Sequence, residues 1–150
     1  LGELSASPAV SVILPVLNEE AHLEDSILAI LSQDYQGSFE VILALGPSRD
    51  RTNEIANALV ARDARVKLVA NPTGKTAAGL NLAVAASQNP VIVRVDGHAE
   101  IPKNYLTLAV EILRETGAVN VGGVMAAVGK SRFEKAVACI AFPVLSSAVT

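Results

Sequence analysis

The sequence has few aromatic side chains, a single cysteine and no tryptophan. Only 3% of its 150 residues are aromatic whereas 51% are hydrophobic, so Val, Ile, Leu and Ala have to build the core. These residues suit a parallel sheet that is covered by helices on both faces. Because Cys139 has no second cysteine to pair with, no disulfide can form within the chain, as expected in a reducing compartment. We interpret Cys139 as a small buried side chain.

The sequence also lacks a basic cluster and a long uninterrupted apolar run. Its formal net charge is −3 and its lysines and arginines are scattered, so we expect no nucleic acid as a partner. Residues 136–149 come closest to a membrane span, which takes about 18 apolar residues, but Pro143 and two serines interrupt them. We interpret this stretch as a core helix, with an interfacial segment as the alternative. No basic flank precedes the first apolar run, so we expect no signal peptide.

Strand patterns and helix patterns alternate along the chain. Apolar, β-branched runs predict strands at residues 9–14, 39–45, 66–70, 91–95 and 119–124. Apolar residues at spacings of three and four predict helices at residues 18–33, 52–60, 76–87, 102–117 and 133–142. The short connections favour right-handed crossovers between parallel strands. We therefore predict one α/β domain over residues 1–150, a three-layer α/β/α sandwich with a mostly parallel sheet.

Several predicted helix ends carry local signals. Asn18 can cap the first helix, and the two acids that follow it then lie in the first turn, where the helix dipole favours them. Asp50 or Thr52 can cap the second helix. Pro102 fits the first turn of the helix that ends before Gly117.

A run of β-branched residues stops abruptly at Asp96-Gly97-His98. In a parallel sheet the polar residues after each strand gather at one rim, where open α/β sheets bind ligands. Asp96 and His98 can point toward one cation if the chain turns at Gly97, and carboxylate and imidazole suit Mn²⁺ or a similar ion. The alternative is that Asp96 caps the following turn and His98 is an exposed loop residue.

Two further segments of this rim carry groups that suit a nucleotide. Gly74-Lys75-Thr76 resembles the end of a phosphate-binding loop, but the full pattern requires glycine where Val69 stands. Lys75 and the backbone N–H groups of a helix start can still hold phosphate, or Lys75 is a solvated side chain. Glu19 and Glu20 can accept hydrogen bonds from a ribose, or they only complement the helix dipole.

Four segments resemble, in order and spacing over residues 10–125, the nucleotide-binding half of a family 2 glycosyltransferase of the GT-A fold. They are Val12-Ile13-Leu14-Pro15-Val16-Leu17-Asn18-Glu19-Glu20, Gly74-Lys75-Thr76-Ala77-Ala78-Gly79-Leu80-Asn81, Val95-Asp96-Gly97-His98 and Ile101-Pro102. The Asp-Gly-His-Ala version is similar to bacterial exopolysaccharide enzymes of the succinoglycan-synthesis type.

The resemblance implies an inverting, metal-dependent transfer of a sugar from a nucleotide-diphosphate sugar to a polysaccharide or glycolipid acceptor. It implies a divalent cation, Mn²⁺ or Mg²⁺, held by Asp96 and His98, of which His98 stands where the family usually has an aspartate. The implied donor-binding residues are Pro15, Asn18 and Glu19 at the nucleoside, Lys75 at the diphosphate, and also Asp50 and Asp96.

The chain departs from the family pattern at several positions. Leu45 and Gly46 stand where an acidic pair usually reads the base, and Leu17 stands where an aromatic residue is common. The family's general base and its Arg/Trp acceptor motif have no match before Thr150, and we do not assign Glu134 as the base. We therefore expect the natural protein to continue past Thr150, and residues 1–150 to bind the donor without transferring sugar.

These features leave other functions open. A nucleotide-binding module without catalysis is favoured by Leu45, Gly46 and the missing base. A nucleotidyltransferase is less favoured, because residues 15–20 are acidic and contain no glycine. For the enzyme we expect a cytoplasmic location, or one at the inner face of the plasma membrane through a further C-terminal part.

Overall fold

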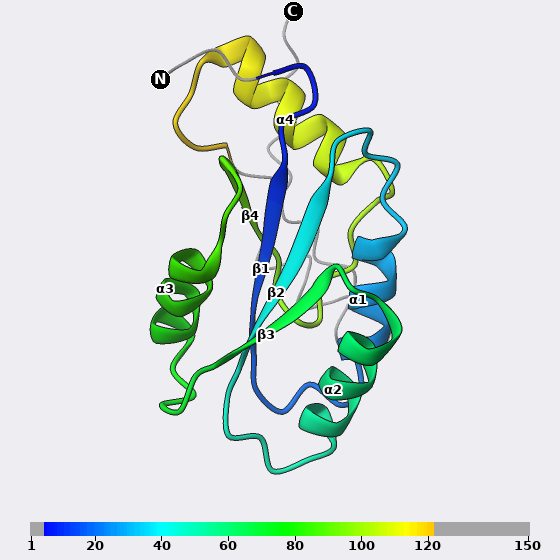
Figure 1. The fold of residues 1–150 in the computed structure, drawn as a ribbon, viewed down its shortest axis with the longest axis vertical. Coiled ribbons are helices and arrows are strands. Elements are labelled where there is room, and N and C mark those ends of the chain that lie inside the picture. The colour runs from blue at the N-terminus through cyan, green and yellow to red at the C-terminus, as the bar shows by residue number, and fades with distance from the viewer. Residues whose placement is uncertain (1–4, 122–150) are drawn as a thin grey trace, which may run out of the picture. The chain divides into compact units, whose positions relative to one another are not determined.

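The computed structural model describes residues 5–121 and contains one four-stranded parallel sheet in that range (Figure 1). The strands are β1 (Val10–Val16), β2 (Phe39–Leu45), β3 (Val66–Ala70) and β4 (Val91–Arg94), in the spatial order β3-β2-β1-β4. The helices are α1 (Leu23–Leu31), α2 (Thr52–Arg62), α3 (Thr76–Ala86) and α4 (Tyr105–Thr116). Strand and helix alternate, as the sequence pattern predicts.

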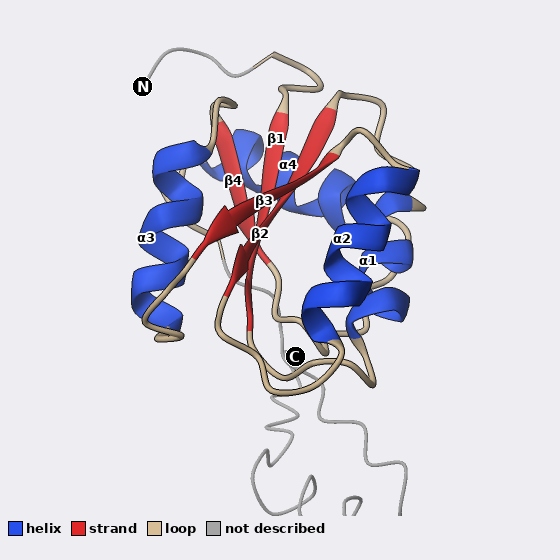
Figure 2. Cartoon of the chain, turned by 60° about the horizontal axis from the view of Figure 1, so that its bottom comes forward, coloured by secondary structure: helices blue, strands red, loops and turns tan. Residues whose placement is uncertain are grey.

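Helices cover both faces of the sheet, which gives three layers (Figure 2). Successive side chains of a strand point to opposite faces. Val12 and Leu14 of β1 therefore join the larger core, which includes residues of α1, α2 and α4. Ile13, between them, packs in a smaller core with Ala83 of α3. Because both faces are covered, the strands are nearly all apolar instead of alternating, and the predicted α/β/α sandwich is confirmed.

Pro15 lies inside β1, whereas the sequence pattern predicted that the strand ends before it. The pairing of β1 with β2 continues through Val16, but the pairing of β1 with β4 ends at Ile13 and Arg94. The Ile13 carbonyl accepts the N–H of Val95 at 3.1 Å, and residues two apart in a strand face the same neighbour. Pro15 thus faces β4 without an N–H to donate, and the ladder stops there.

Most predicted element boundaries are confirmed to within one or two residues. β2 and β3 have the predicted bounds, and α3 and β4 each end one residue early. Gly117 ends α4 with φ 63°, a left-handed conformation that glycine adopts without strain.

Two predicted helix starts are wrong. Asn18 does not cap α1, which begins only at Leu23; Asn18 itself has φ 55°, and its side chain bonds another loop. The two acids after Asn18 therefore lie in a loop, outside the first helical turn. Pro102 does not lie in the first turn of α4; its carbonyl accepts the N–H of Tyr105, in a turn that precedes the helix.

The last predicted elements fall largely outside the described residues. The predicted strand at 119–124 is absent over 119–121, and its remainder lies outside the described range. The predicted helix at 133–142, together with Glu134 and Cys139, lies wholly outside it. Among residues 5–121 no helix is both long enough and apolar enough to cross a membrane.

A buried carboxylate, that of Glu40, links the strands near their amino-terminal ends. It accepts hydrogen bonds from the Ser11 hydroxyl and the Lys67 ammonium, both at 2.6 Å, and from the Gln88 N–H and the Asn89 amide, both at 3.3 Å. These donors lie on β1, on β3 and just before β4. Burial by itself raises the pKa of Glu40, but the hydrogen bonds from Lys67 and Ser11 outweigh it and hold the pKa below its ordinary value.

We expect Glu40→Gln to lower the free energy of unfolding by about 1–3 kcal/mol, because the buried hydroxyl and the ammonium lose a charged acceptor. A carboxyl whose pKa is lowered by folding stabilises the protein above its ordinary pKa, and that contribution is lost as the pH falls through the folded-state value. The variant should therefore lose less stability than the unchanged protein on acidification. Urea unfolding at several pH values measures both effects.

The exposed Glu54, which pairs with Arg51 on the surface, provides the matched control. Glu54→Gln should change the free energy of unfolding by less than about 0.5 kcal/mol. An equal loss of stability on acidification in Glu40→Gln and in the unchanged protein would contradict the role given to Glu40.

Candidate functional site

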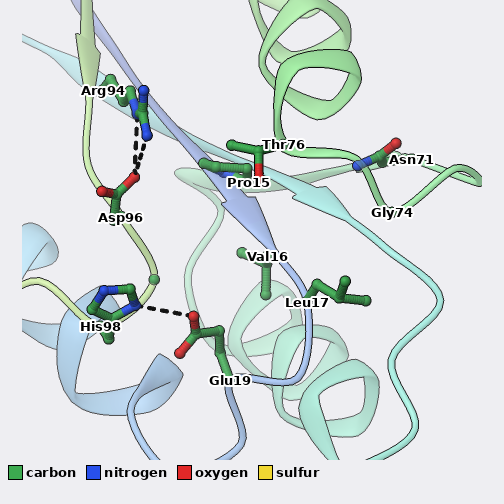
Figure 3. Close-up of a pocket in the computed structure, with 11 residues that line it drawn as sticks. Pro15, Val16, Leu17, Glu19, Asn71, Gly74, Thr76, Arg94, Asp96 and His98 are labelled. Atoms are coloured by element: carbon green, nitrogen blue, oxygen red, sulfur yellow. Dashed lines mark hydrogen bonds and ion pairs between the residues drawn. The ribbon is translucent and has the colours of Figure 1, made fainter.

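A cleft of about 320 Å³ lies at the carboxyl-terminal edge of the sheet (Figure 3). Three segments line it: Pro15, Val16, Leu17 and Glu19 from the end of β1; Asn71, Gly74 and Thr76 between β3 and α3; and Arg94, Asp96, Gly97 and His98 from the end of β4. Because the β1–β4 ladder stops at Pro15, the chain after β4 can turn away from β1. The cleft is therefore where the sheet topology places a ligand site.

The structure brings together part of the predicted site. Pro15, Glu19, Asp96 and His98 all line the cleft. The other predicted donor-binding residues, Asn18, Asp50 and Lys75, are not among its lining residues, and their contact with a donor stays a prediction.

Asp96 pairs with Arg94 at the cleft. Its Oδ1 atom accepts hydrogen bonds from Arg94 Nη2 at 3.0 Å and from Arg94 Nε at 3.2 Å. The two side chains are 44% and 53% exposed, and an exposed ion pair contributes little to stability. Arg94 can therefore leave Asp96 for a stronger anion at small cost.

His98 pairs with Glu19 across the cleft. The distance from His98 Nδ1 to Glu19 Oε1 is 3.1 Å. The His98 side chain is 65% exposed, whereas that of Glu19 is 20% exposed. The contact joins the loop after β1 to the loop after β4. These are the two loops that diverge because the β1–β4 ladder stops at Pro15.

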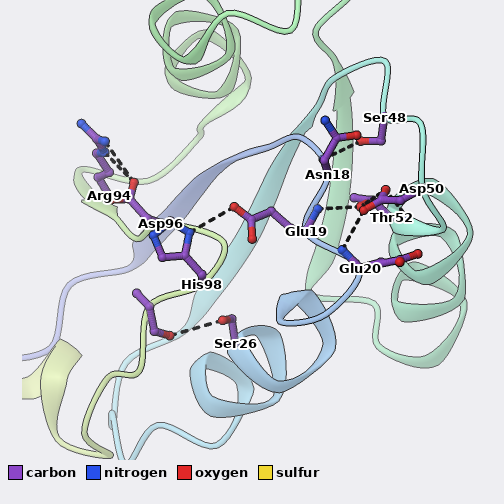
Figure 4. Close-up of polar contacts among 11 residues, drawn as sticks. Asn18, Glu19, Glu20, Ser26, Ser48, Asp50, Thr52, Arg94, Asp96 and His98 are labelled. Atoms are coloured by element: carbon purple, nitrogen blue, oxygen red, sulfur yellow. Dashed lines mark hydrogen bonds and ion pairs between the residues drawn. The ribbon is translucent and has the colours of Figure 1, made fainter. Parts of the chain in front are cut away.

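The loop after β1 and the loop after β2 hold each other through reciprocal hydrogen bonds (Figure 4). The N–H groups of Asn18, Glu19 and Glu20 donate to Ser48 Oγ at 3.0 Å, Thr52 Oγ1 at 2.7 Å and Asp50 Oδ2 at 3.2 Å. In return, the side chains of Asn18 and Glu20 accept the N–H groups of Arg49 and Arg51 at 2.8 and 2.9 Å. We call these residues of 18–20 and 48–52 the loop clamp.

Asp50 serves the loop clamp and the start of α2. Its Oδ1 accepts the Thr52 hydroxyl at 2.5 Å and the Thr52 N–H at 3.0 Å. The N-cap of α2 is Arg51, so the prediction that Asp50 or Thr52 caps this helix is wrong: Asp50 precedes the cap and Thr52 is the first helical residue. The hydrogen bond from the Thr52 hydroxyl is the largest of the effects that hold the pKa of Asp50 below its ordinary value. The Asp50 carboxylate is thus an acceptor for the protein's own donors.

The loop between β3 and α3 is built around the buried Asn71. Its amide donates to the Lys75 carbonyl at 3.1 Å, and its Oδ1 accepts the Thr73 hydroxyl at 3.0 Å. Gly74 turns the chain with φ 64°. Lys75 is exposed at the start of α3, and the structure gives its ammonium no partner among the described residues.

Two of the departures from the family pattern are physically linked. A Cβ atom added at Gly46 would lie 3.0 Å from Leu17 Cδ1, 3.2 Å from the Val16 carbonyl oxygen and 3.3 Å from Gly74 Cα. Any side chain at Gly46 would therefore press on the backbone of Val16 and Gly74 as well as on the end of the Leu17 side chain. Leu17 lines the cleft with an apolar surface.

The oxygen and nitrogen atoms at the cleft fit a divalent cation that is bound partly by the protein and partly by a phosphate. Residues 5–121 hold no cluster of three or more His, Cys, Asp or Glu side chains of the kind that binds a metal by itself. Asp96 Oδ2 and His98 Nε2 have no hydrogen bond to the part of the chain that the structure describes. Two such ligands suit an ion that completes its shell with phosphate oxygens and water.

Sequence reasoning missed Arg94 and the role of Thr52. Arg94 carried a signal, because a charged residue two positions before Asp96 points to the same side of the chain. Thr52 was predicted only as a helix cap, and its bond to the Glu19 N–H joins residues that are distant in sequence.

We expect Thr52→Val to lower the free energy of unfolding by about 1–3 kcal/mol, because the N–H of Glu19 and the carboxylate of Asp50 both lose the Thr52 hydroxyl. Thr52 is fully buried, so the replaced hydroxyl cannot be substituted by water without rearrangement. Urea unfolding measures the loss, and Thr107→Val is the control, because the Thr107 hydroxyl makes an exposed contact at 3.4 Å. Equal stability of the two variants would contradict the loop clamp.

Proteins of known sequence resemble most of the chain. The model of the family described as Glycosyl transferase family 2 matches residues 11–140. The succinoglycan biosynthesis protein ExoA of Rhizobium meliloti is 35% identical over 91% of this chain and 42% of its own length. An uncharacterized glycosyltransferase of Haemophilus influenzae is 37% identical over 66% of this chain and 40% of its own length. The chain thus spans less than half the length of these relatives.

Solved structures share the fold. The mannosyltransferase PcManGT from Pyrobaculum calidifontis, in complex with GDP-Man and Mn²⁺, has a TM-score of 0.64 and 29% identity over 71% of this chain and 32% of that protein. S. aureus TarS has a TM-score of 0.65 and 23% identity over 82% of this chain and 24% of that protein. The expected GT-A fold class is confirmed by these neighbours.

Proposed function

The chain belongs to glycosyl transferase family 2, and on this premise we propose that it is the donor-binding part of an enzyme that transfers a sugar from a nucleotide-diphosphate sugar. The proposed acceptor is a polysaccharide or glycolipid, and the proposed transfer is inverting and metal-dependent. The similarity to a succinoglycan biosynthesis protein supports such an acceptor. The expected location, cytoplasmic or at the inner face of the plasma membrane, stays a prediction.

One observation carries the proposal: the loop after β1 and the end of β4 with its following loop bring Glu19, Arg94, Asp96 and His98 to one cleft at the edge of the sheet. Nucleotides bind at such edges in open α/β sheets. The apolar side chain of Leu17 in the same cleft suits the face of a base or a sugar. The cleft thus combines polar groups for a charged diphosphate with an apolar wall.

Asp96 and His98 are the residues that would hold the divalent cation, Mn²⁺ or Mg²⁺. The cation, when bound, neutralises the negative charge that develops on the departing diphosphate. A mannosyltransferase neighbour crystallised with GDP-Man and Mn²⁺ supports this choice of ion. Because residues 5–121 hold no cluster of three or more His, Cys, Asp or Glu ligands, we expect the cation and the nucleotide to bind together.

Arg94 and Lys75 supply positive charge for the diphosphate. The Arg94 guanidinium already holds a carboxylate oxygen, and the same planar group suits a phosphate. Lys75 stands at the start of α3, where backbone N–H groups also favour an anion. The diphosphate would therefore be held between the start of α3 and the end of β4.

In the transfer itself, an acceptor hydroxyl oxygen bonds to the anomeric carbon while the bond from that carbon to the diphosphate oxygen breaks. The hydroxyl proton passes to a general base. At the cleft Asp96 is proposed to hold the cation and Glu19 contacts His98, so we assign the base to neither. The described residues bind and orient the donor, and they leave the base to another part of the enzyme.

We expect Asp96→Ala and His98→Ala each to weaken nucleoside diphosphate binding in the presence of Mn²⁺ by at least about tenfold, because each removes one of two protein ligands. Binding without metal should change little. Isothermal titration calorimetry with UDP and GDP, with and without Mn²⁺, measures both.

The exposed acid Asp25, on α1 outside the cleft, provides the control, and Asp25→Ala should bind like the unchanged protein. Binding that is independent of metal and unaffected by either substitution would remove the proposed metal site. If the unchanged protein binds neither nucleotide, the proposed function itself is wrong.

Purified residues 1–150 are expected to bind the donor without transferring its sugar, because the family's general base has no match before Thr150. The assay measures release of nucleoside diphosphate from UDP-sugars and GDP-sugars in the presence of polysaccharide and glycolipid acceptors. Calorimetric binding of the donor by the same preparation controls for misfolding. Sugar transfer by residues 1–150 would contradict the prediction, and donor binding by a full-length protein that never transfers sugar would favour a non-catalytic module.

A further inference from the structure

The Glu19 side chain contacts His98 of the protein itself, although the family resemblance places Glu19 at the nucleoside of the donor. Its Oε1 atom lies 3.1 Å from His98 Nδ1, and its side chain is largely buried at the edge of the cleft (Figure 4). An ionised carboxylate only accepts hydrogen bonds, so the proton of a neutral His98 has to be on Nδ1. The unshared electron pair is then on Nε2.

The backbone of Glu19 is held more firmly than that of His98. Its N–H donates to the buried Thr52 hydroxyl at 2.7 Å, and its carbonyl accepts the N–H groups of His22 and Leu23 at 3.0 and 2.9 Å. His98 lies in the exposed loop after β4, and its contact with Glu19 is the hydrogen bond that the structure gives its ring. Glu19 is therefore the fixed partner, and His98 is the side chain that it orients.

Gly97 leaves the space through which Glu19 reaches His98. A Cβ atom added at Gly97 would lie 3.2 Å from Glu19 Cγ and 3.4 Å from Glu19 Cδ. The methylene and carboxyl carbons of Glu19 thus pack against the bare backbone of Gly97. A side chain at this position would press on Glu19 next to its contact with His98.

We propose that Glu19 is a positioning residue that fixes the ring orientation and the Nδ1–H tautomer of His98, so that Nε2 is presented to the divalent cation. The inference rests on the proposed function for the identity of the cation, but the Glu19–His98 contact exists without it. A histidine that binds a metal through one nitrogen commonly donates its other N–H to a carboxylate, which orients the ring and raises its basicity as a ligand. Glu19 has the carboxylate and the fixed position that such an orienting partner of a metal-binding histidine requires.

A positioning role and a direct contact of Glu19 with the ribose predict different effects of Glu19→Ala on nucleotide binding. A ribose contact predicts that Glu19→Ala weakens nucleotide binding whether or not metal is present. A positioning role predicts that only the metal-dependent part of binding weakens, and that the effect requires His98.

The first test measures the tautomer of His98 in the metal-free protein, by long-range proton–nitrogen NMR correlation at about pH 8, where an ordinary imidazole is neutral. We expect the unchanged protein to carry the proton on Nδ1 of His98 and Glu19→Ala to lose this preference. Glu19→Gln, which keeps a carbonyl oxygen at the same reach, should retain it in part. The other histidine of the sequence, His22, serves as an internal reference whose spectrum should not change.

The second test measures binding of Mn²⁺ in the presence of UDP or GDP. Glu19→Ala should weaken it by about 10–100-fold, the usual effect of removing a group that orients a metal ligand. Gly97→Ala should weaken it in the same direction by displacing Glu19. Glu24→Ala is the control, because Glu24 is an exposed glutamate of α1 that pairs with Arg62 and belongs neither to the cleft nor to the loop clamp.

A double-mutant cycle decides whether the two residues act together. In the His98→Ala background, Glu19→Ala should cause no further loss of Mn²⁺ binding, whereas independent roles would give additive losses. The proposal would be overturned by additive losses, by an equal effect of Glu24→Ala, or by weaker nucleotide binding of Glu19→Ala without metal. A His98 proton on Nε2 in the unchanged protein would also overturn it. If no nucleotide binds but the Nδ1–H tautomer depends on Glu19, the proposed function fails while the positioning of His98 by Glu19 stands.

Discussion

The cleft depends on one missing hydrogen-bond donor in the middle of the sheet. Pro15 continues β1 in its pairing with β2 but has no N–H for β4, so the β1–β4 ladder ends while the β1–β2 ladder runs on. An ordinary residue there could extend the ladder and carry β4 alongside β1 past the present edge. Because the ladder stops, the two chains part, and the space between them is lined by Glu19 on one side and by Asp96 and His98 on the other.

The two walls of this cleft differ in how firmly they are held. The wall that follows β1 is fixed by the loop clamp, in which backbone N–H groups and side-chain oxygens of 18–20 and 48–52 satisfy one another. The wall at the end of β4 carries Arg94, Asp96 and His98, whose side chains are about half exposed or more. Arg94 and Asp96 are held by an exposed ion pair, and His98 by one hydrogen bond to Glu19. A firm wall beside exposed ligands suits a site that a donor phosphate and a cation complete.

Two departures from the family pattern, Leu17 and Gly46, lie next to each other beside the cleft. The backbone of Val16 and Gly74, together with the end of the Leu17 side chain, crowds the space where a Cβ atom at Gly46 would lie. Leu17 and Gly46 thus lie close together where the loops after β1 and β2 meet. Under the proposed function, recognition of the base would use other groups, and the backbone and the Leu17 side chain are available in the cleft.

The sequence by itself determined the order of the elements, the parallel sheet and the rim at which polar residues gather, because these follow from apolar periodicity, from strand–helix alternation and from handedness. It also pointed to Asp96 and His98 at a strand end. Only the tertiary structure decided the partners. Asn18 was predicted to cap a helix but bonds a loop about 30 residues away, and Glu19 was predicted to contact a ribose or a helix dipole but meets His98 at a separation of 79 residues. Local patterns reveal which groups are present, whereas the pairing of groups that are distant in sequence depends on how the loops meet after the sheet has formed.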